Sequence, residues 1–371
     1  MDNRETAYRG CMLGLAVGDA MGYAVDRLSW EEICRDYGPD GIRGYDLVNG
    51  YADVTSHTQV AAYCANGLLV GLTRCQMMGR EAPYIRYVDL ALREWSQGQH
   101  LRRLPDRTAF WVSEAEELRR RRCMDTRMLD SLSRDRLGTM EAPLNHNETP
   151  GAICAAVSVG AFFDNGRMEP QEIGTLGAEV LALVSGEPAA FLSGAVVAYA
   201  VAGILQDPET PLREHFLQAI EVVAGQFGRA YPQVEELTLQ LHRAVKLAGN
   251  TLMPERDAME HLKCDNCAGV LAGAIYASLR KSDDFDGAMI LAVNHSGRSA
   301  AVAALTGAFL GAYRGADGIP DFYLEGLELV PLLTELAEDL RLGCPKVLSA
   351  GFFDDTWDHK YVQGMPPEGV I

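Results

Sequence analysis

The sequence predicts an all-α protein, a compact bundle of helices, and three observations carry this prediction. Apolar residues recur at helical spacing, for example at Val234, Leu237, Leu241 and Val245, with charged residues on the opposite side. The alternation of apolar and polar residues that indicates a β-strand is hard to find. Several segments consist mainly of small residues, and helices with so little side chain pack closely against neighbours on all sides.

The expected helices follow one another along the whole chain. The segments with helical spacing or a run of small residues are 10–25, 84–95, 151–163, 193–205, 234–247, 268–279, 299–313 and 332–342. Most of the Gly- and Pro-rich loops open onto a helix, at 36–45, 148–152, 185–189 and 294–300. Helix N-termini that converge on one place would form an anion site without the use of basic residues.

The acidic composition argues against two classes of partner. The net charge is −18 and the sequence pI is about 4.9. Such a surface repels phosphate backbones and anionic membranes, so we expect neither a nucleic acid nor a membrane as partner. The basic run at 119–122 is surrounded by acidic residues, and we interpret it as a solvated helix face. The apolar run at 189–205 is short for a membrane span and predicts a buried core helix.

The cysteines and the N-terminus predict a cytoplasmic protein. The chain has nine cysteines at irregular spacing. Cys264 and Cys267 have C-x-x-C spacing, but no second pair of ligands for a structural zinc ion stands nearby. Reduced thiols in the cytosol are therefore expected. The first ten residues carry no apolar signal segment, and the chain has no linker or low-complexity tract, so we expect one domain over 1–371.

A series of motifs stands in the order seen in ADP-ribosylglycohydrolases. They are RGCMLGLAVGDAMGYAVD, YGPDGI, TSHTQ, LGTMEAPLN, SGEPAAFLSGA, AVNHSGRSAAVAALTGAFLGAYRG and IPDFYLEGLEL. The chain resembles this family over a core of roughly 5–345, with 346–371 as a C-terminal extension. The resemblance implies an orthogonal all-α bundle with a central cleft. It also implies that active members bind two magnesium ions and ADP-ribose, and cleave the glycosidic bond at the ribose C1″.

The resemblance fails at the two metal-binding motifs of active members. Where active members have Thr-Asp-Asp-Thr, this chain has Thr-Ser-His-Thr at 55–58. Where they have Gly-Asp-Ser/Thr-Asp-Ser/Thr, it has Gly-Arg-Ser-Ala-Ala at 297–301. The carboxylates that would bind the metals are replaced by Ser56, His57, Arg298 and Ala300. Mg²⁺ prefers hard carboxylate ligands. A guanidinium about 5 Å from a divalent ion is repelled by roughly 6–7 kcal/mol at an effective dielectric constant of ~20. We therefore expect no cofactor, although the family resemblance implies Mg²⁺.

Two acidic residues near the N-terminus are catalytic candidates. Asp19 stands in a small, apolar helix, so it is either a cleft carboxylate or a core aspartate that caps or pairs. Asp26 lies seven residues later, about two helical turns on and on a similar face, where the family usually has Glu. It either activates a substrate water or is merely a charge at the helix end.

The other candidates would bind a ligand. Arg298 could supply a fixed cation in the cleft, which pairs with Asp19 or Asp26 or binds a ligand phosphate. The alternative is an arginine that reaches solvent, and we favour the role in the cleft. His57 could be a general base or a zinc ligand together with His295, but a satisfied polar histidine is the favoured interpretation. The remaining candidate ligand-binding residues are Thr55, Ser56, Asn147, Gly151 and Ser299.

Three functions are compatible with these residues. The one that we adopt is a non-hydrolysing or atypical family member that binds ADP-ribose, a related nucleotide or a protein partner in its cleft. The second is a metal-independent hydrolase or lyase on an ADP-ribosyl or NAD-derived substrate, acting through Asp19 or Asp26 and Arg298. The third is a structural protein whose cleft is filled by Arg298 and Glu187.

Overall fold

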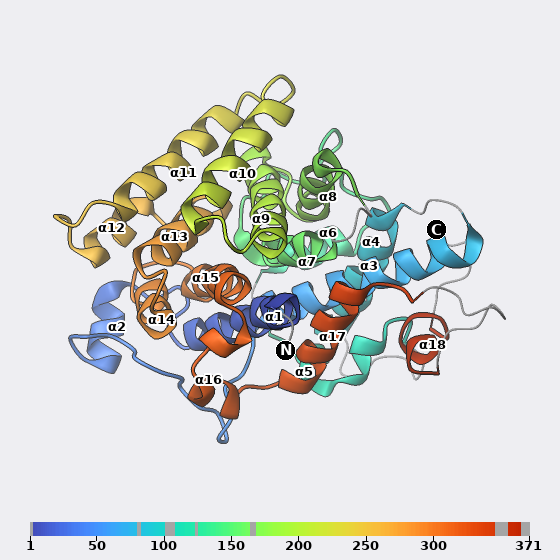
Figure 1. Cartoon of the computed structure of the whole chain (residues 1–371), viewed down its shortest axis with the longest axis horizontal. Helices are drawn as coiled ribbons and strands as arrows, with labels where there is room; N and C mark the ends of the chain where they lie inside the picture. The colour runs from blue at the N-terminus through green and yellow to red at the C-terminus, as the bar shows by residue number, and fades with distance from the viewer. Residues whose placement is uncertain are drawn as a thin grey trace.

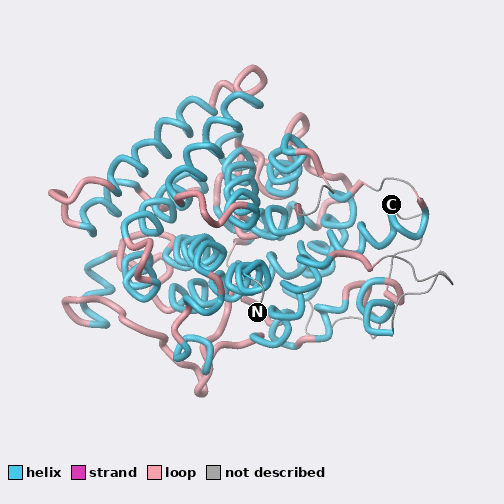
Figure 2. The backbone as a smooth tube through the Cα atoms, in the orientation of Figure 1, coloured by secondary structure: helices cyan, strands magenta, loops and turns pink. Residues whose placement is uncertain are grey.

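A computed structural model of the protein describes residues 3–79, 83–100, 108–122, 125–163, 168–345 and 355–364. Within these ranges the chain forms eighteen α-helices and three short 3-10 helices, and it contains no β-strand (Figures 1 and 2). The all-α prediction is confirmed. The predicted helix at 234–247 is α11, and the four apolar residues of its stripe are buried.

The helices have the following bounds. They are α1 (Asn3–Tyr23), α2 (Trp30–Tyr37), α3 (Ser56–Met78), α4 (Tyr84–His100), α5 (Glu116–Arg119), α6 (Thr126–Leu132), α7 (Ala155–Phe162), α8 (Pro170–Ala182), α9 (Pro188–Gln206), α10 (Leu212–Phe227), α11 (Val234–Ala248), α12 (Glu255–Leu262), α13 (Cys267–Arg280), α14 (Phe285–Val293), α15 (Ser299–Arg314), α16 (Asp321–Glu325), α17 (Val330–Leu342) and α18 (Asp355–Tyr361). The 3-10 helices are η1 (Trp111–Glu114), η2 (Pro150–Ala152) and η3 (Ala316–Gly318).

Helices α1 and α15 pack side by side at backbone contact in the middle of the molecule (Figure 1). A Cβ atom on Gly14 would lie 2.1 Å from the carbonyl oxygen of Gly307, and one on Gly22 would lie 2.5 Å from the Cα atom of Ala300. Only glycine permits such an approach. Residues further along α1 contact residues nearer the start of α15, so the two helices are antiparallel. The end of α1 therefore meets the beginning of α15.

Helix α9 is buried in the core, as the apolar run at 189–205 predicted. It is the one helix among the described residues that is long and apolar enough to cross a membrane by length and composition, and 78% of its most apolar window is buried. Its neighbour α8 approaches it closely, since Gly177 and Gly194 face each other's backbones.

The segment after the predicted core contributes one helix to the packing. On α18, the indole of Trp357 donates a hydrogen bond to Thr73 Oγ1 of α3 over 3.1 Å. The hydroxyl of Tyr361 donates to the Asp339 carboxylate of α17 over 2.6 Å, and buried Lys360 pairs with the same carboxylate. The predicted extension thus holds α3 and α17 together, while 346–354 and 365–371 lie outside the described residues.

Candidate functional site

A cavity of about 230 Å³ opens where the end of α1, the start of α3 and the start of α15 meet. It is also bordered by the segment before α6 and by η2. Six of the residues that the sequence singles out line it: Asp26, Thr55, Ser56, His57, Gly151 and Arg298. Asp19, Asn147 and Ser299 do not line it. Residues more than 240 positions apart in sequence thus meet at one place, because α1 and α15 run antiparallel.

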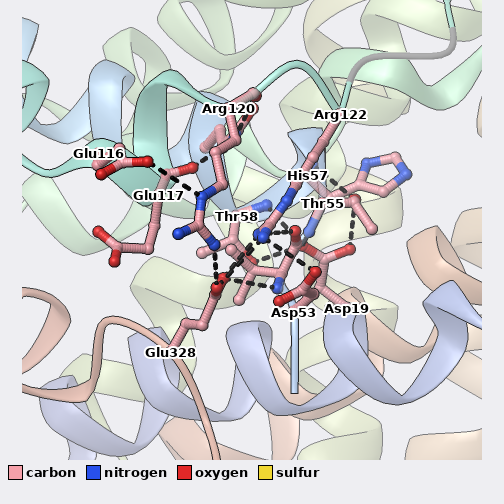
Figure 3. Close-up of polar contacts among 12 residues, drawn as sticks. Asp19, Asp53, Thr55, His57, Thr58, Glu116, Glu117, Arg120, Arg122 and Glu328 are labelled. Atoms are coloured by element: carbon pink, nitrogen blue, oxygen red, sulfur yellow. Dashed lines mark hydrogen bonds and ion pairs between the residues drawn. The ribbon is translucent and has the colours of Figure 1, made fainter. Parts of the chain in front are cut away.

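Asp19 does not line the cavity but fixes the start of α3, through Thr55, which does line it (Figure 3). Its fully buried carboxylate accepts hydrogen bonds from Thr55 N and Oγ1 over 2.8 and 2.5 Å, and from Thr58 N and Oγ1 over 3.0 and 2.6 Å. Burial raises the pKa of Asp19, and the four hydrogen bonds oppose this effect. Its oxygens are therefore occupied by the backbone and hydroxyls of α3, as in the interpretation of a core aspartate that pairs.

Asp26 lines the cavity from a turn beyond the end of α1, not from a face of that helix. Helix α1 ends at Tyr23, and the left-handed backbone at Arg27 redirects the chain. Oδ1 of Asp26 accepts a hydrogen bond of 3.2 Å from Ala300 N, in the first turn of α15. Its Oδ2 lies 3.4 Å from Arg27 Nε and 3.7 Å from Arg298 Nε. A carboxylate near a helix N-terminus is electrostatically favourable, so Asp26 connects the two central helices.

Arg298 directly precedes α15, and its side chain turns into the cavity. Only 13% of the side chain is exposed, which excludes the interpretation that it extends into solvent. Its Nε atom is buried and has no hydrogen-bond acceptor among the residues that the structure describes. Ala300, which stands one residue into α15, lines the same cavity. The guanidinium group therefore adds a positive charge to the place where the start of α15 is already partly positive.

His57 is a buried, neutral histidine on the cavity wall. The residue is 3% exposed, and its Nδ1 atom has no hydrogen-bond partner in the described part of the chain. Burial lowers the pKa of His57 to about 4, and Arg298 and Arg27 act in the same direction. The expectation of a satisfied polar histidine is therefore wrong for Nδ1. The hydroxyl of Thr55, which caps α3, accepts a hydrogen bond from the backbone of His57 over 3.2 Å and holds this residue at the start of the helix.

Arg122 corrects the interpretation of the basic run at 119–122 as a solvated helix face. Helix α5 ends at Arg119, and Arg122 is buried, with its guanidinium directed toward Glu328 and Asp53 (Figure 3). Its guanidinium donates to both carboxylate oxygens of Glu328 over 2.6 and 3.1 Å, and lies 3.1 Å from Asp53. Burial raises the pKa of Asp53, whereas that of Glu328 is lowered because hydrogen bonds from Arg122 outweigh its burial. Glu328 is 206 residues away in sequence, so local charge pattern could not reveal this pair.

Residues 1–347 match the sequence profile of the ADP-ribosylglycohydrolase family. The chain belongs to the ADP-ribosylglycohydrolase family. An uncharacterized protein of Archaeoglobus fulgidus is 28% identical over 344 residues, which cover 91% of this chain and 96% of the relative. A solved structure described as an ADP-ribosylglycohydrolase-related protein complex is similar with a TM-score of 0.63 and 23% identity, over 92% of this chain and 99% of that one. The family and the all-α fold expected from the motifs are confirmed.

Besides Arg122, three residues that line the cavity of this ADP-ribosylglycohydrolase-family protein were not predicted from the sequence. Tyr23 and Arg27 follow from the position of Asp26 once the end of α1 is known. Asp125 stands before α6 and accepts hydrogen bonds from the backbone of Arg127 and from the hydroxyl of Thr149. An aspartate before a helix is a recognisable N-cap, but this signal identifies a helix start and not a cavity.

Asn147 and Ser299 lie near the cavity without lining it. Asn147 borders a separate surface hollow of about 460 Å³, together with Arg127. Its buried Oδ1 accepts from Thr149 N over 3.2 Å, and its buried Nδ2 has no hydrogen-bond partner. Ser299 is buried, and its hydroxyl donates to the backbone of His295 over 3.4 Å. The cavity and this hollow are neighbours, because Asp125 lines the cavity and the next residue, Thr126, lines the hollow.

The cavity does not fit the dinuclear magnesium centre that the family resemblance implies. Its two carboxylates, Asp26 and Asp125, already accept hydrogen bonds from the protein, and Arg298 stands beside them. Within the described ranges, no group of three His, Cys, Asp or Glu side chains is placed to hold a metal ion. The zinc alternative meets the same difficulty, because His295 does not line the cavity with His57. We derive no step that passes through a metal.

Proposed function

We propose that this member of the ADP-ribosylglycohydrolase family binds ADP-ribose or a related nucleotide without magnesium and without hydrolysing it. One observation carries the proposal: the guanidinium of Arg298 lies in the cavity, beside Asp26, at the helix start where active members are expected to supply metal-binding carboxylates. A cavity with its own fixed cation suits an anionic ligand directly. Such a cavity needs no divalent ion between the protein and the ligand.

The charges around the cavity support an anionic ligand. Arg27 and Arg298 line it together with the two aspartates, the third lining arginine, Arg122, already pairs with Glu328 and Asp53, and α3 and α15 begin there. Helix N-termini add partial positive charge. Buried His57 contributes no charge near neutral pH, because its pKa is about 4.

The dimensions favour a ligand that extends beyond the cavity. Sites for drug-sized ligands measure roughly 300–1,000 Å³, so a cavity of about 230 Å³ accommodates one end of a nucleotide. The neighbouring hollow of about 460 Å³ is lined by Arg127 and Asn147, and the Nδ2 atom of Asn147 has no partner among the described residues. Both are donors suited to phosphate oxygens. Glu187, which pairs with His146 over 3.0 Å, does not line the cavity, which argues against an occluded cleft.

Calorimetric titration of ADP-ribose into the purified protein tests this proposal, once with EDTA and once with Mg²⁺. Equal affinity in the two titrations is the expected result. Binding that requires Mg²⁺ would contradict the proposal. No binding in either titration would also contradict it, and would direct attention to a protein partner.

The exposure of Asp26 to the cavity favours a second candidate, a metal-independent hydrolase. A carboxylate can assist an oxocarbenium-like transition state without metal, but Asp26 already accepts from Ala300 N and pairs with Arg27 and Arg298. Release of ADP-ribose from ADP-ribosylated or NAD-derived substrates in EDTA would support this candidate if the release disappears in Asp26→Asn. We expect no release by either protein. Release by the unmodified protein that EDTA abolishes and Mg²⁺ restores would contradict both candidates.

A further inference from the structure

Two buried nitrogen atoms without a partner in the described ranges belong to side chains at one end of the cavity, the end formed by the starts of α3 and α15, which we call its inner end. They are Nδ1 of His57, on the first turn of α3, and Nε of Arg298, just before α15. The side chains that bear these atoms line the same cavity. Leaving a buried polar group unsatisfied is costly, so the two groups mark side chains on one cavity wall whose hydrogen-bonding capacity the described protein does not use.

The neighbouring carboxylates do not satisfy these atoms. Asp26 Oδ2 lies 3.7 Å from Arg298 Nε, which is beyond hydrogen-bond distance, and its Oδ1 accepts from Ala300 N. Asp125 accepts from Thr149 Oγ1 and from the backbone of Arg127. Arg122, on another wall, is held by Glu328 and Asp53. Arg298 is thus the cavity arginine that combines burial with an Nε atom lacking any acceptor.

We infer that the inner end of this cavity is an oxyanion subsite, and that the natural ligand carries a phosphate monoester or a carboxylate on the part that enters it. This inference rests on the proposed function and specifies its ligand class. A guanidinium fork is best satisfied by two oxygens of one oxyanion. The starts of α3 and α15 add favourable partial charge. A plain ribose, whose hydroxyls are neutral, would leave the loosely paired Arg298 with Asp26 as its only nearby anion in the described cavity.

The subsite distinguishes ligands by their terminal group. A nucleoside diphosphate sugar that bears a phosphate or carboxylate on its terminal sugar places an anion against Arg298 and His57. ADP-ribose itself, with an unsubstituted terminal ribose, makes the outer contacts only. His57 and Arg298 are therefore specificity-determining residues of the proposed site.

The test compares ADP-ribose with ADP-ribose that carries a phosphate on its terminal ribose, by calorimetry in EDTA. We expect the phosphorylated ligand to bind at least about tenfold more tightly, as a charge-assisted contact in a buried site would provide. Arg298→Gln is expected to remove this preference. Arg35→Gln is the matched control, since it removes the same charge from a side chain that is 66% exposed, and it should retain the preference. Equal affinities in the unmodified protein, or a preference that survives Arg298→Gln, would overturn the inference.

Inorganic phosphate separates failure of the inference from failure of the proposed function. If neither nucleotide binds, the proposed function fails, and phosphate binding followed by ³¹P NMR then decides the subsite alone. Binding to the unmodified protein and to Arg35→Gln, but not to Arg298→Gln, supports the subsite; binding to none of the three overturns it. Should Arg298→Gln fail to fold, Arg298→Lys keeps the charge without the fork, and His57→Gln changes the other unpartnered group. Each is expected to weaken the preference, and an unchanged preference in both would overturn the inference.

Discussion

The Nε atom of Arg298 lies 3.7 Å from Oδ2 of Asp26, close enough for an ion pair and too far for a hydrogen bond. Asp26 is anchored independently by the backbone of Ala300. The pair therefore does not consume the hydrogen-bonding capacity of the guanidinium. An arginine that is buried and only loosely paired is suited to bind an anionic ligand.

Asp19→Asn is expected to destabilise the protein by about 3 kcal/mol, because four hydrogen bonds to a buried carboxylate are weakened and the new amide group faces the donors of Thr55 and Thr58. Urea unfolding measures the change. Asp40→Asn, at an exposed position, is the control. A loss no larger than that of the control would show that Asp19 does not fix the start of α3.

Gly14→Ala is expected to lower the free energy of unfolding by about 2–3 kcal/mol, because the added methyl group would meet the backbone oxygen of Gly307. Gly225 in α10 provides the matched comparison, since a Cβ atom there has nothing within 4 Å. Gly225→Ala should stabilise the protein by about 0.5–1 kcal/mol, through its higher helix propensity. Similar effects of the two substitutions would contradict the close packing of α1 on α15.

The stability of the protein is expected to fall at acidic pH in part through His57. Its pKa is about 4 in the folded protein, whereas an unfolded histidine titrates near ~6.5. As pH falls below ~6.5 the unfolded chain gains a proton at this residue that the folded chain does not, so the folded state loses up to about 1.4 kcal/mol per pH unit until pH 4 is reached.

Urea unfolding at several values between pH 7.5 and 4.5 measures this dependence. The free energy of unfolding of the unmodified protein should fall more steeply than that of His57→Gln, while His261→Gln, at an exposed position, controls for the loss of a histidine. Parallel curves for the unmodified protein and His57→Gln would show that His57 is accessible to protons in the folded state.

Arg122→Ala is expected to cost about 2–4 kcal/mol, since it removes the cation beside Asp53 and one of the two cations that pair with buried Glu328, which keeps Arg120. The adjacent Arg121 is exposed, and Arg121→Ala should change the unfolding free energy by less than about 0.5 kcal/mol. Thermal unfolding of the two variants side by side is the measurement. Equal melting temperatures would restore the interpretation of a solvated basic run.

Much of the fold was predictable because its determinants are local. The small residues of 10–25 and 299–313 predicted central helices, and α1 and α15 pack against each other at backbone contact. Helical spacing similarly predicted α11. The end of α1 was not predictable in the same way, since apolar small residues continue to Val25 although the helix stops at Tyr23. Asp26 was therefore assigned to a helical face that it does not occupy.

The site was predictable where family motifs marked it, and unpredictable where partners are distant in sequence. The motifs at 55–58 and 297–301 led to His57 and Arg298, which the fold brings to one cavity. Whether Arg298 faced the cleft or solvent depended on the packing of α15 against α1. The burial of Arg122 depends on Glu328, and no local pattern connects these two positions.

The central claim, that this cavity of an ADP-ribosylglycohydrolase-family protein has no site for a divalent cation, is tested most directly with Mn²⁺. This ion shares the preference of Mg²⁺ for carboxylate and other oxygen ligands, and its free form has a strong electron paramagnetic resonance signal. We predict that adding the protein to Mn²⁺ leaves the free-ion signal unchanged. Loss of the signal at micromolar protein, with stoichiometric binding abolished by Asp26→Ala, would contradict the account.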